Sequence, residues 1–290
     1  MTRFKADLGL LSVTVFWGTT FIASKLLLAE ISLATYMFYR LSLAALFMVM
    51  IAFKYRRKFS RQVMIHGLIL GVLLYTSYFF QMWGIQQTSA SNAGFITGLS
   101  VVLVPVFGFL FFKEKTSLQV WSSALMAVAG LLLLSGANPF KWNHGDLKVL
   151  ICAIIFAFHI IFTGKYSRIN NVYLLTSVQL VVIAFFSFLV FLPQMNALPI
   201  PSTKNLLILL YLALFGTVFT FLMQTSMQRF TTVARTAVIF SMEPVFAALF
   251  AYLVAGETLS FQGWIGGLFI VLGMINAEFP YHKFKSANSH

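Results

Sequence analysis

The feature that most constrains this chain is a succession of long apolar runs with almost no charge inside them. Of its 290 residues, 60% are hydrophobic and only 9% are charged, whereas a soluble domain carries about 25% charged residues. About 20 apolar residues in a helix cross a hydrocarbon layer about 30 Å thick. The runs are continuously apolar and do not alternate with polar residues, which favours helices over a β-barrel. We therefore predict an all-α membrane protein with ten transmembrane helices, at residues 8–28, 33–53, 64–86, 92–112, 118–136, 146–165, 172–192, 204–226, 234–255 and 261–279.

The basic residues between the runs predict how the chain is oriented. The net charge of +13 comes from short connecting segments such as Lys54–Arg61. Such segments are typical of topology signals and not of a nucleic-acid-binding surface, so no nucleic-acid partner is expected. If the N-terminus is cytoplasmic, fifteen of the 20 Lys and Arg residues lie on the cytoplasmic side, four lie on the other side, and Arg40 falls within the second run. Because Lys and Arg concentrate in cytoplasmic loops, both termini are predicted to be cytoplasmic.

A duplicated pattern divides the chain into two halves. The tripeptide Pro-Val-Phe begins at Pro105 and again at Pro244, and Lys25 and Lys165 each end the first run of a half. Further matches between the halves are Trp121 with Trp264, Gly130 with Gly273, and "QQTSASNAGFITG" (Gln86–Gly98) with "QRFTTVARTAVIF" (Gln228–Phe240).

The halves are expected to have opposite orientations in the membrane. Each repeat has five spans, and a second copy that follows an odd number of crossings enters from the other face. We predict repeats at residues 7–136 and 145–280, followed by a cytoplasmic tail at 281–290. Inverted repeats of this kind form many secondary transporters, in which the substrate lies near the midplane between the halves. A central cavity is therefore expected between the two inverted five-helix repeats.

Five segments together carry a family resemblance. They are "FWGTTF" (Phe16–Phe21), "YRLSLAAL" (Tyr39–Leu46), "QTSASNAGFITGLSVVLVPVF" (Gln87–Phe107), "KEKTSLQVWSSALMAVAG" (Lys113–Gly130) and "GETLSFQGWIGGLFIVLG" (Gly256–Gly273). In order and spacing, the chain resembles the EamA-type transporters of the drug/metabolite transporter superfamily over nearly its whole length.

The resemblance implies a multi-pass carrier of the bacterial inner membrane with both termini in the cytoplasm. Members of this family move amino acids, amines, nucleobases and other small metabolites, often outward. The second half departs from the pattern, because it has "SVQLVV" (Ser177–Val182) where the first has "FYRLSL" (Phe38–Leu43). A role for arginine at this position therefore does not carry over to the second half.

Glu243 is the deepest acidic residue in the predicted spans. It lies nine residues after position 234 and twelve before position 255, or roughly 14 and 18 Å from the ends of its span at 1.5 Å per residue. An ionised group in hydrocarbon costs at least about 2.5 kcal/mol. The carboxyl group must therefore face a wet cavity, pair with a cation or stay protonated. Two interpretations stay open: a site for a substrate amine or a proton, or a neutral side chain hydrogen-bonded to a neighbouring helix.

Arg40 is the other deep charge, about seven residues into the second span. Its long side chain could reach the membrane interface, bind a substrate carboxylate or brace Glu243. The family resemblance favours a structural role for this arginine.

Several neutral side chains interrupt the apolar runs and are candidates to line the cavity. Each could instead bond to a neighbouring helix, as polar groups in membrane helices often do. Tyr75 is a further candidate for an aromatic wall. Pro105 and Pro244 interrupt the helical hydrogen-bond ladder and are predicted to kink both helices, for shape or for gating. The candidate substrate-binding residues are Trp17, Tyr78, Gln81, Asn92, His159, Gln179, Gln224 and Glu243.

An enzyme and a channel are the alternatives to a carrier. The sequence has no H-E-x-x-H, G-x-S-x-G or P-loop pattern, and its scattered His residues and one Cys make no metal site. We therefore assign no catalytic residues, metal or cofactor. Channels usually form their pore by oligomeric symmetry, whereas this chain carries its own repeat. The prediction is a secondary transporter that exports a small metabolite by alternating access. Its expected partners are the lipid bilayer, the substrate and a candidate coupling proton, and the oligomeric state stays open.

Overall fold

The computed structural model describes residues 2–88, 90–136, 143–197, 201–255 and 260–278. Within these ranges the regular elements are all helical. The α-helices are α1 (Arg3–Leu28), α2 (Leu33–Phe53), α3 (Arg61–Ile85), α4 (Ala90–Gly98), α5 (Ser100–Phe112), α6 (Leu118–Ser135), α7 (His144–Ile169), α8 (Val172–Phe191), α9 (Thr203–Ala213), α10 (Thr220–Gln228), α11 (Val233–Phe240), α12 (Glu243–Ala255) and α13 (Phe261–Glu278). Short elements are the 3₁₀ turns η1 (Arg56–Lys58) and η2 (Leu192–Ala197) and the π-helix η3 (Leu214–Phe219).

The ten predicted spans correspond to ten helical segments, with ends that differ by a few residues. Nine segments in the described part of the chain are long and apolar enough to cross a membrane, and Phe261–Ala277 is a shorter apolar helix. Large apolar side chains such as Phe109, Leu125 and Leu253 are exposed on the outside of the molecule. The prediction of an all-α membrane protein is confirmed. The predicted tail at 281–290 lies outside the described residues.

Two of the spans, the fourth and the ninth, are each interrupted by a turn of one or two residues. The fourth is divided at Leu99 into α4 and α5, and the ninth is divided at Ser241–Met242 into α11 and α12. Pro244 is the second residue of α12, where its missing N–H costs no helical hydrogen bond. Pro105, in contrast, lies inside α5, six residues after the break. The interruptions therefore occupy equivalent places in the two repeats and precede both prolines.

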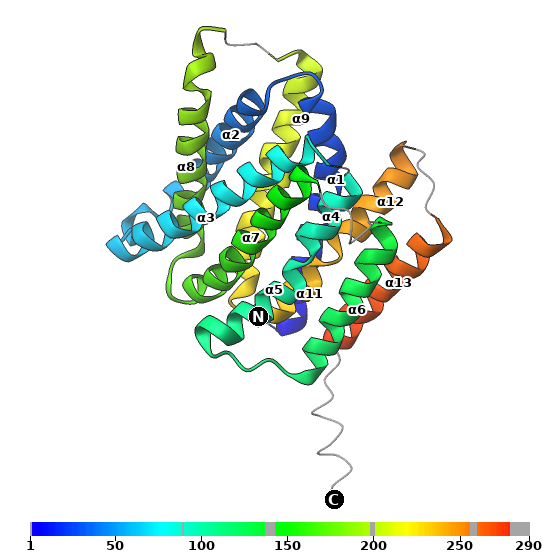
Figure 1. The fold of residues 1–290 in the computed structure, drawn as a ribbon. Coiled ribbons are helices and arrows are strands. Elements are labelled where there is room, and N and C mark those ends of the chain that lie inside the picture. The colour runs from blue at the N-terminus through cyan, green and yellow to red at the C-terminus, as the bar shows by residue number, and fades with distance from the viewer. Residues whose placement is uncertain (1, 89, 137–142, 198–200, 256–259, 279–290) are drawn as a thin grey trace, which may run out of the picture.

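Helices of the first repeat pack directly against helices of the second. Helix α3 contacts α7 and α8, α2 contacts α8, α6 pairs with α13, and α1 lies against α10 and α12 (Figure 1). Close approach of α3 to α8 requires glycine: a Cβ atom at Gly67 or Gly71 would lie 2.5 Å from the Cβ atom of Val178 or Val182. The two halves therefore form one interlocked bundle.

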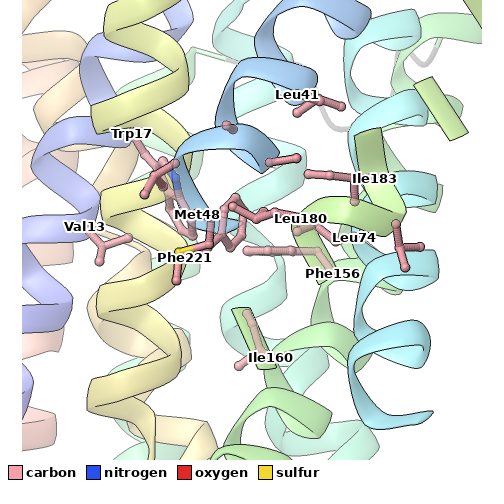
Figure 2. Packing of buried hydrophobic residues seen from close by; sticks show 14 of the residues in the cluster. Val13, Trp17, Leu41, Met48, Leu74, Phe156, Ile160, Leu180, Ile183 and Phe221 are labelled. Carbon is pink, nitrogen blue, oxygen red and sulfur yellow. The ribbon is translucent and has the colours of Figure 1, made fainter. Parts of the chain in front are cut away.

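Because the spans cross in alternation, the start of α1 and the end of α13 lie on the same face, at the bottom in Figure 1. We call this the N-terminal face and the opposite one the far face. The buried apolar core includes Val13 of α1, Ile160 of α7 and Leu180 of α8, which belong to one cluster (Figure 2). Trp17, Phe156 and Phe221 belong to the same cluster.

Candidate functional site

A central cavity lies between the two repeats. It encloses about 600 Å³ of empty space, including the open space at its mouth. Most of its wall comes from α1, α3 and α7, and single residues are added by α2 (Arg40), α4 (Thr97), α10 (Phe221) and α12 (Glu243). Both repeats therefore contribute to the wall.

The cavity occupies the half of the molecule nearer the far face. Along α1 it extends from Trp17 to Ser24, and along α3 it reaches Ile85, the last residue of that helix. Towards the N-terminal face the space between the helices is filled by buried apolar side chains, including Leu10, Val13 and Ile160. The protein is thus hollow on one side of its midplane and closed on the other.

Glu243 lies in the cavity wall at the point where the ninth span is broken. It is the first residue of α12, its side chain is partly accessible, and it makes no hydrogen bond or ion pair with other described residues. The N-terminal end of a helix carries a partial positive charge that favours a carboxylate. A smaller cavity, lined by Gly94, Gly98 and Pro244 among others, also has Glu243 in its wall. Of the environments predicted for this residue, the structure provides a cavity, and no cationic partner occurs in the part of the chain that the structure describes.

Arg40 points inward and is held by hydrogen bonds to neutral groups. Its side chain is 2% exposed, so it does not extend to the membrane interface as one of its predicted alternatives required. Nη1 donates to the hydroxyl of Tyr36, and Nη2 donates to the hydroxyl of Tyr78 at 3.2 Å. Nε donates to Thr217 Oγ1 at 3.1 Å, and Nη2 also donates to the Gly216 carbonyl at 3.3 Å. These hydrogen bonds replace contacts of the guanidinium group with water, which explains why Arg40 can stay buried.

The π-helix η3 supplies two of these acceptors. Gly216 and Thr217 both belong to it, and Thr217 Oγ1 in turn donates to the Leu212 carbonyl at 2.9 Å. A side chain at position 216 would come within 2.7 Å of Thr20 and 3.3 Å of Arg40 Nη2. Single-turn π-helices often mark functional positions, and here the π-helix shapes the surroundings of the buried guanidinium group.

Aromatic rings form the floor and one wall of the cavity. The Trp17 ring centroid lies 5.8 Å from that of Phe156, 5.6 Å from that of Phe221 and 5.0 Å from that of Phe240. Tyr78 completes the wall, with its ring 6.1 Å from Phe221. These separations are those of packed aromatic pairs.

The predicted site residues divide into two groups. Trp17, Tyr78, Gln81 and Glu243 line the cavity, and Gln81 donates to Thr97 at 3.4 Å. Four others lie outside it: His159, Gln179, Gln224 and Asn92. The first three of these are fully buried between α7, α8 and α10.

Two candidates, the amide Asn92 and the aromatic residue Tyr75, have structural roles instead. Asn92 donates to Asp146 at 3.5 Å, and Asp146 forms the capping box of α7 with Asn143. Tyr75 stacks on Phe186 of α8, with ring centroids 5.2 Å apart. It does not line the cavity, although it was a candidate for the aromatic wall. The ring of Tyr75 instead packs against α8.

Sequence reasoning missed several cavity residues. They include Thr20 and Ser24 of α1, Cys152 and Phe156 of α7, and Phe221 of α10. For α1 a signal was present, because Trp17, Thr20 and Ser24 recur at helical spacing and so share one face. No comparable pattern of small polar residues distinguishes Cys152 and Phe156 in their apolar run.

These observations define a class: a multi-pass α-helical membrane protein with a central cavity between two tandem repeats. The EamA-like transporter family matches the chain twice, over residues 4–136 and 143–277. The chain belongs to this family.

Several relatives carry transporter names. An "Uncharacterized transporter" of Archaeoglobus fulgidus is 34% identical over 275 residues, which cover 94% of this chain and 85% of the relative. A WAT1-related chloroplastic protein of Arabidopsis thaliana is 25% identical and covers 93% of this chain and 69% of its own length. A solved crystal structure superposes with a TM-score of 0.79 at 19% identity, over 95% of this chain and 97% of the solved one. The last comparison supports the fold alone.

Proposed function

We propose that the protein is a secondary transporter that exports a small metabolite by alternating access, with the substrate bound in the cavity. The single observation that carries this proposal is a partly accessible carboxyl group, Glu243, which has no partner among the described residues and lies at the turn between α11 and α12, in the wall of a cavity that is closed on one side. Broken helices at the midplane between repeats are where secondary transporters place their substrates and coupling ions. The aromatic wall of Trp17 and Tyr78 suits a small planar or cationic molecule.

The orientation is part of the same proposal. Since the basic residues between the spans favour a cytoplasmic N-terminal face, the cavity opens to the outside of the inner membrane. The structure then corresponds to an outward-facing conformation. Glu243 would bind a substrate amine or a coupling proton, and Arg40 would keep the neighbouring tyrosines in place.

A loss of the Glu243 charge tests the proposal. We compare the metabolites released by cells that express the wild type, Glu243→Gln or no transporter, and then measure counterflow of the released compound with purified protein in liposomes. Glu243→Gln keeps the size of the side chain, so membrane insertion is expected to be unchanged. Transport is expected to fall at least about tenfold, because the carboxylate is the unpaired acid of the cavity wall.

Glu30→Gln is the matched control. Glu30 is exposed at the far face, accepts a hydrogen bond from Asn205 at 2.7 Å and lies outside the cavity. This variant should transport like the wild type. Wild-type transport by Glu243→Gln across the pH range would remove the carboxylate from the mechanism. Flux far above carrier turnover, without counterflow, would support a channel, and product formation without a second compartment would support an enzyme.

A further inference from the structure

We propose that the cytoplasmic half of the transport path is a buried polar contact between α7, α8 and α10, which is closed in this conformation and becomes wet in the inward-facing one. We call it the seam and define it by His159 and Thr163 of α7, Thr176 and Gln179 of α8, and Gln224 of α10. The inference rests on the proposed function, because it names the second half of the same path.

The seam consists of polar side chains that are only partly hydrogen-bonded. All five residues are 0% exposed. His159 Nε2 bonds to Gln179 Oε1 at 3.1 Å, and Gln179 Nε2 donates to Thr225 at 3.5 Å. Atoms without a partner include His159 Nδ1, Thr163 Oγ1, Thr176 Oγ1 and Gln224 Oε1.

Unpaired polar atoms at these positions need a physical reason. Each buried polar group without a partner costs about 1–3 kcal/mol, and apolar side chains of the same size would avoid that cost. Nine such atoms occur among the described residues, and eight of them lie between the midplane and the N-terminal face; the exception is the hydroxyl of Tyr75. Water that enters in another conformation would satisfy these groups, since buried waters typically bond to otherwise unpaired polar atoms.

The seam begins directly beneath the cavity. The ring of His159 stacks with Phe156 at 5.8 Å between centroids, and it meets the ring of Phe221 edge-on at 6.0 Å. Phe156 and Phe221 both belong to the cavity wall. A shift of these two rings would therefore connect the cavity to the seam without crossing another layer of side chains.

The repeat gives the seam and the cavity equivalent places. From the first repeat, the cavity is lined mainly by α1 and α3, with single residues of α2 and α4. The counterparts of α1, α2 and α3 in the second repeat are α7, α8 and α9–α10. Residue by residue, Gln179 of the seam corresponds to Arg40 of the cavity, and Gln224 corresponds to Met82. Because the repeats are inverted, a path that opens to the far face in one repeat has a counterpart that opens to the N-terminal face in the other.

Hydrogen bonds close the seam at the N-terminal face. Arg168 Nη2, at the end of α7, donates to the carbonyl of Thr231 in the connection between α10 and α11 at 3.1 Å. Asn170 Nδ2 and His66 Nδ1 lie 2.8 Å apart between α7 and α3. The Arg168 bond is part-buried and joins α7 to the connection after α10, two elements that must separate if the seam opens, and the Asn170 bond holds the end of α7 against α3.

Side-specific thiol labelling tests the inference. In a Cys152→Ser background, single cysteines replace Gln224 or Thr163 in the seam, Met82 in the cavity and Val181 on α8, whose side chain is 44% exposed towards lipid. A membrane-impermeant thiol reagent is applied to intact cells or to inside-out vesicles. Thr163→Cys is close to isosteric, so it serves if Gln224→Cys does not accumulate.

We expect the seam cysteines to react from the cytoplasmic side only, at least about tenfold faster than Val181→Cys, because a minor inward-facing population suffices for labelling. Adding Arg168→Gln should increase that rate several-fold. Seam cysteines that stay unreactive while Met82→Cys reacts from outside and the wild type performs counterflow would overturn the seam and leave the proposed function standing. Reaction of the seam from outside alone would also overturn it. Failure of Met82→Cys to react from outside would instead count against the cavity and the proposed function.

Discussion

The cavity and the seam occupy equivalent places in the two repeats but differ in their chemistry. The cavity wall holds a guanidinium group with several hydrogen-bond partners and an accessible carboxylate, Arg40 and Glu243. The seam holds amides, hydroxyls and an imidazole, several of whose atoms have no partner. A guanidinium group and a carboxyl group thus lie where a ligand has room to bind, whereas amides, hydroxyls and an imidazole line the part that is shut. The difference indicates that the substrate is recognised in the cavity and passes through the seam.

The two broken helices show the same asymmetry. Val104 precedes Pro105 in the first repeat, and Glu243 precedes Pro244 in the second. Only in the second does the break coincide with the start of a half-helix at an acidic residue that faces a cavity. Both repeats therefore have the interruption, but only the second has an acidic residue at it.

The largest effect on stability is expected from Arg40→Gln, which gives this cavity position the residue type of its counterpart in the seam, Gln179. Arg40→Gln introduces the amide that Gln179 provides in the second repeat, and it leaves Tyr36, Tyr78 and Thr217 without their donor. Hydrogen bonds to a charged group contribute about 1.5–3 kcal/mol each, so we expect destabilisation of about 3 kcal/mol in thermal unfolding of the detergent-solubilised protein. Gln179→Leu is the comparison and should cost less, because its partners are fewer. Equal losses of stability in the two variants would mean that the hydrogen bonds of Arg40 stabilise the protein no more than those of Gln179.

A smaller effect is expected where α3 meets the seam helix α8. Gly67→Ala would place a methyl group 2.5 Å from Val178 Cβ, and overpacking of a close contact costs about 1–3 kcal/mol. Gly94→Ala is the matched control, since a Cβ atom there meets nothing within 4 Å. The midpoint of thermal unfolding should fall for Gly67→Ala and stay near the wild-type value for Gly94→Ala. Similar midpoints for both variants would show that α8 yields easily and is not fixed against α3.

The smallest effect is expected at the ion pair on the N-terminal face. Lys165 Nζ lies 3.4 Å from Glu114 Oε1 and 3.3 Å from the centre of the Phe112 ring, linking α7 to the end of α5. The side chains of Lys165 and Glu114 are 37% and 35% exposed, and ion pairs with this exposure contribute about 0–1 kcal/mol. Glu114→Gln should therefore change the labelling rate of Gln224→Cys by about fivefold or less. A much larger change would identify this ion pair as a main closure of the seam.

Much of the fold was predictable because hydrocarbon imposes a simple requirement on sequence. Runs such as 33–53 and 118–136 agree with α2 and α6 to within one residue, since a span must be apolar and of fixed length. The breaks at Leu99 and Ser241 were not predictable from the prolines alone. Pro105 is accommodated inside α5, and the position of each break depends on packing between the repeats.

The site was predictable in part. The depth of Glu243 and Trp17 marked them, because a charge or a tryptophan far from the interface is unusual in a membrane helix. His159 and Gln179 also lie six and seven residues inside their predicted spans. With Gln224 they nevertheless belong to the closed seam, because depth alone does not say on which side of the midplane the molecule is hollow. Cys152 and Phe156 carried no signal, since their contribution to the wall follows from the tertiary packing of α7.

The most direct test of a path that opens to one side at a time is simultaneous labelling of its two halves. A protein with Met82→Cys and Gln224→Cys in the Cys152→Ser background is exposed to distinguishable impermeant thiol reagents, one on each side of the membrane. We expect that adding Arg168→Gln, which releases the bond to Thr231, raises cytoplasmic labelling of Gln224→Cys and lowers outside labelling of Met82→Cys together. If both positions become more reactive at once, the two halves open as a continuous channel and alternating access is wrong.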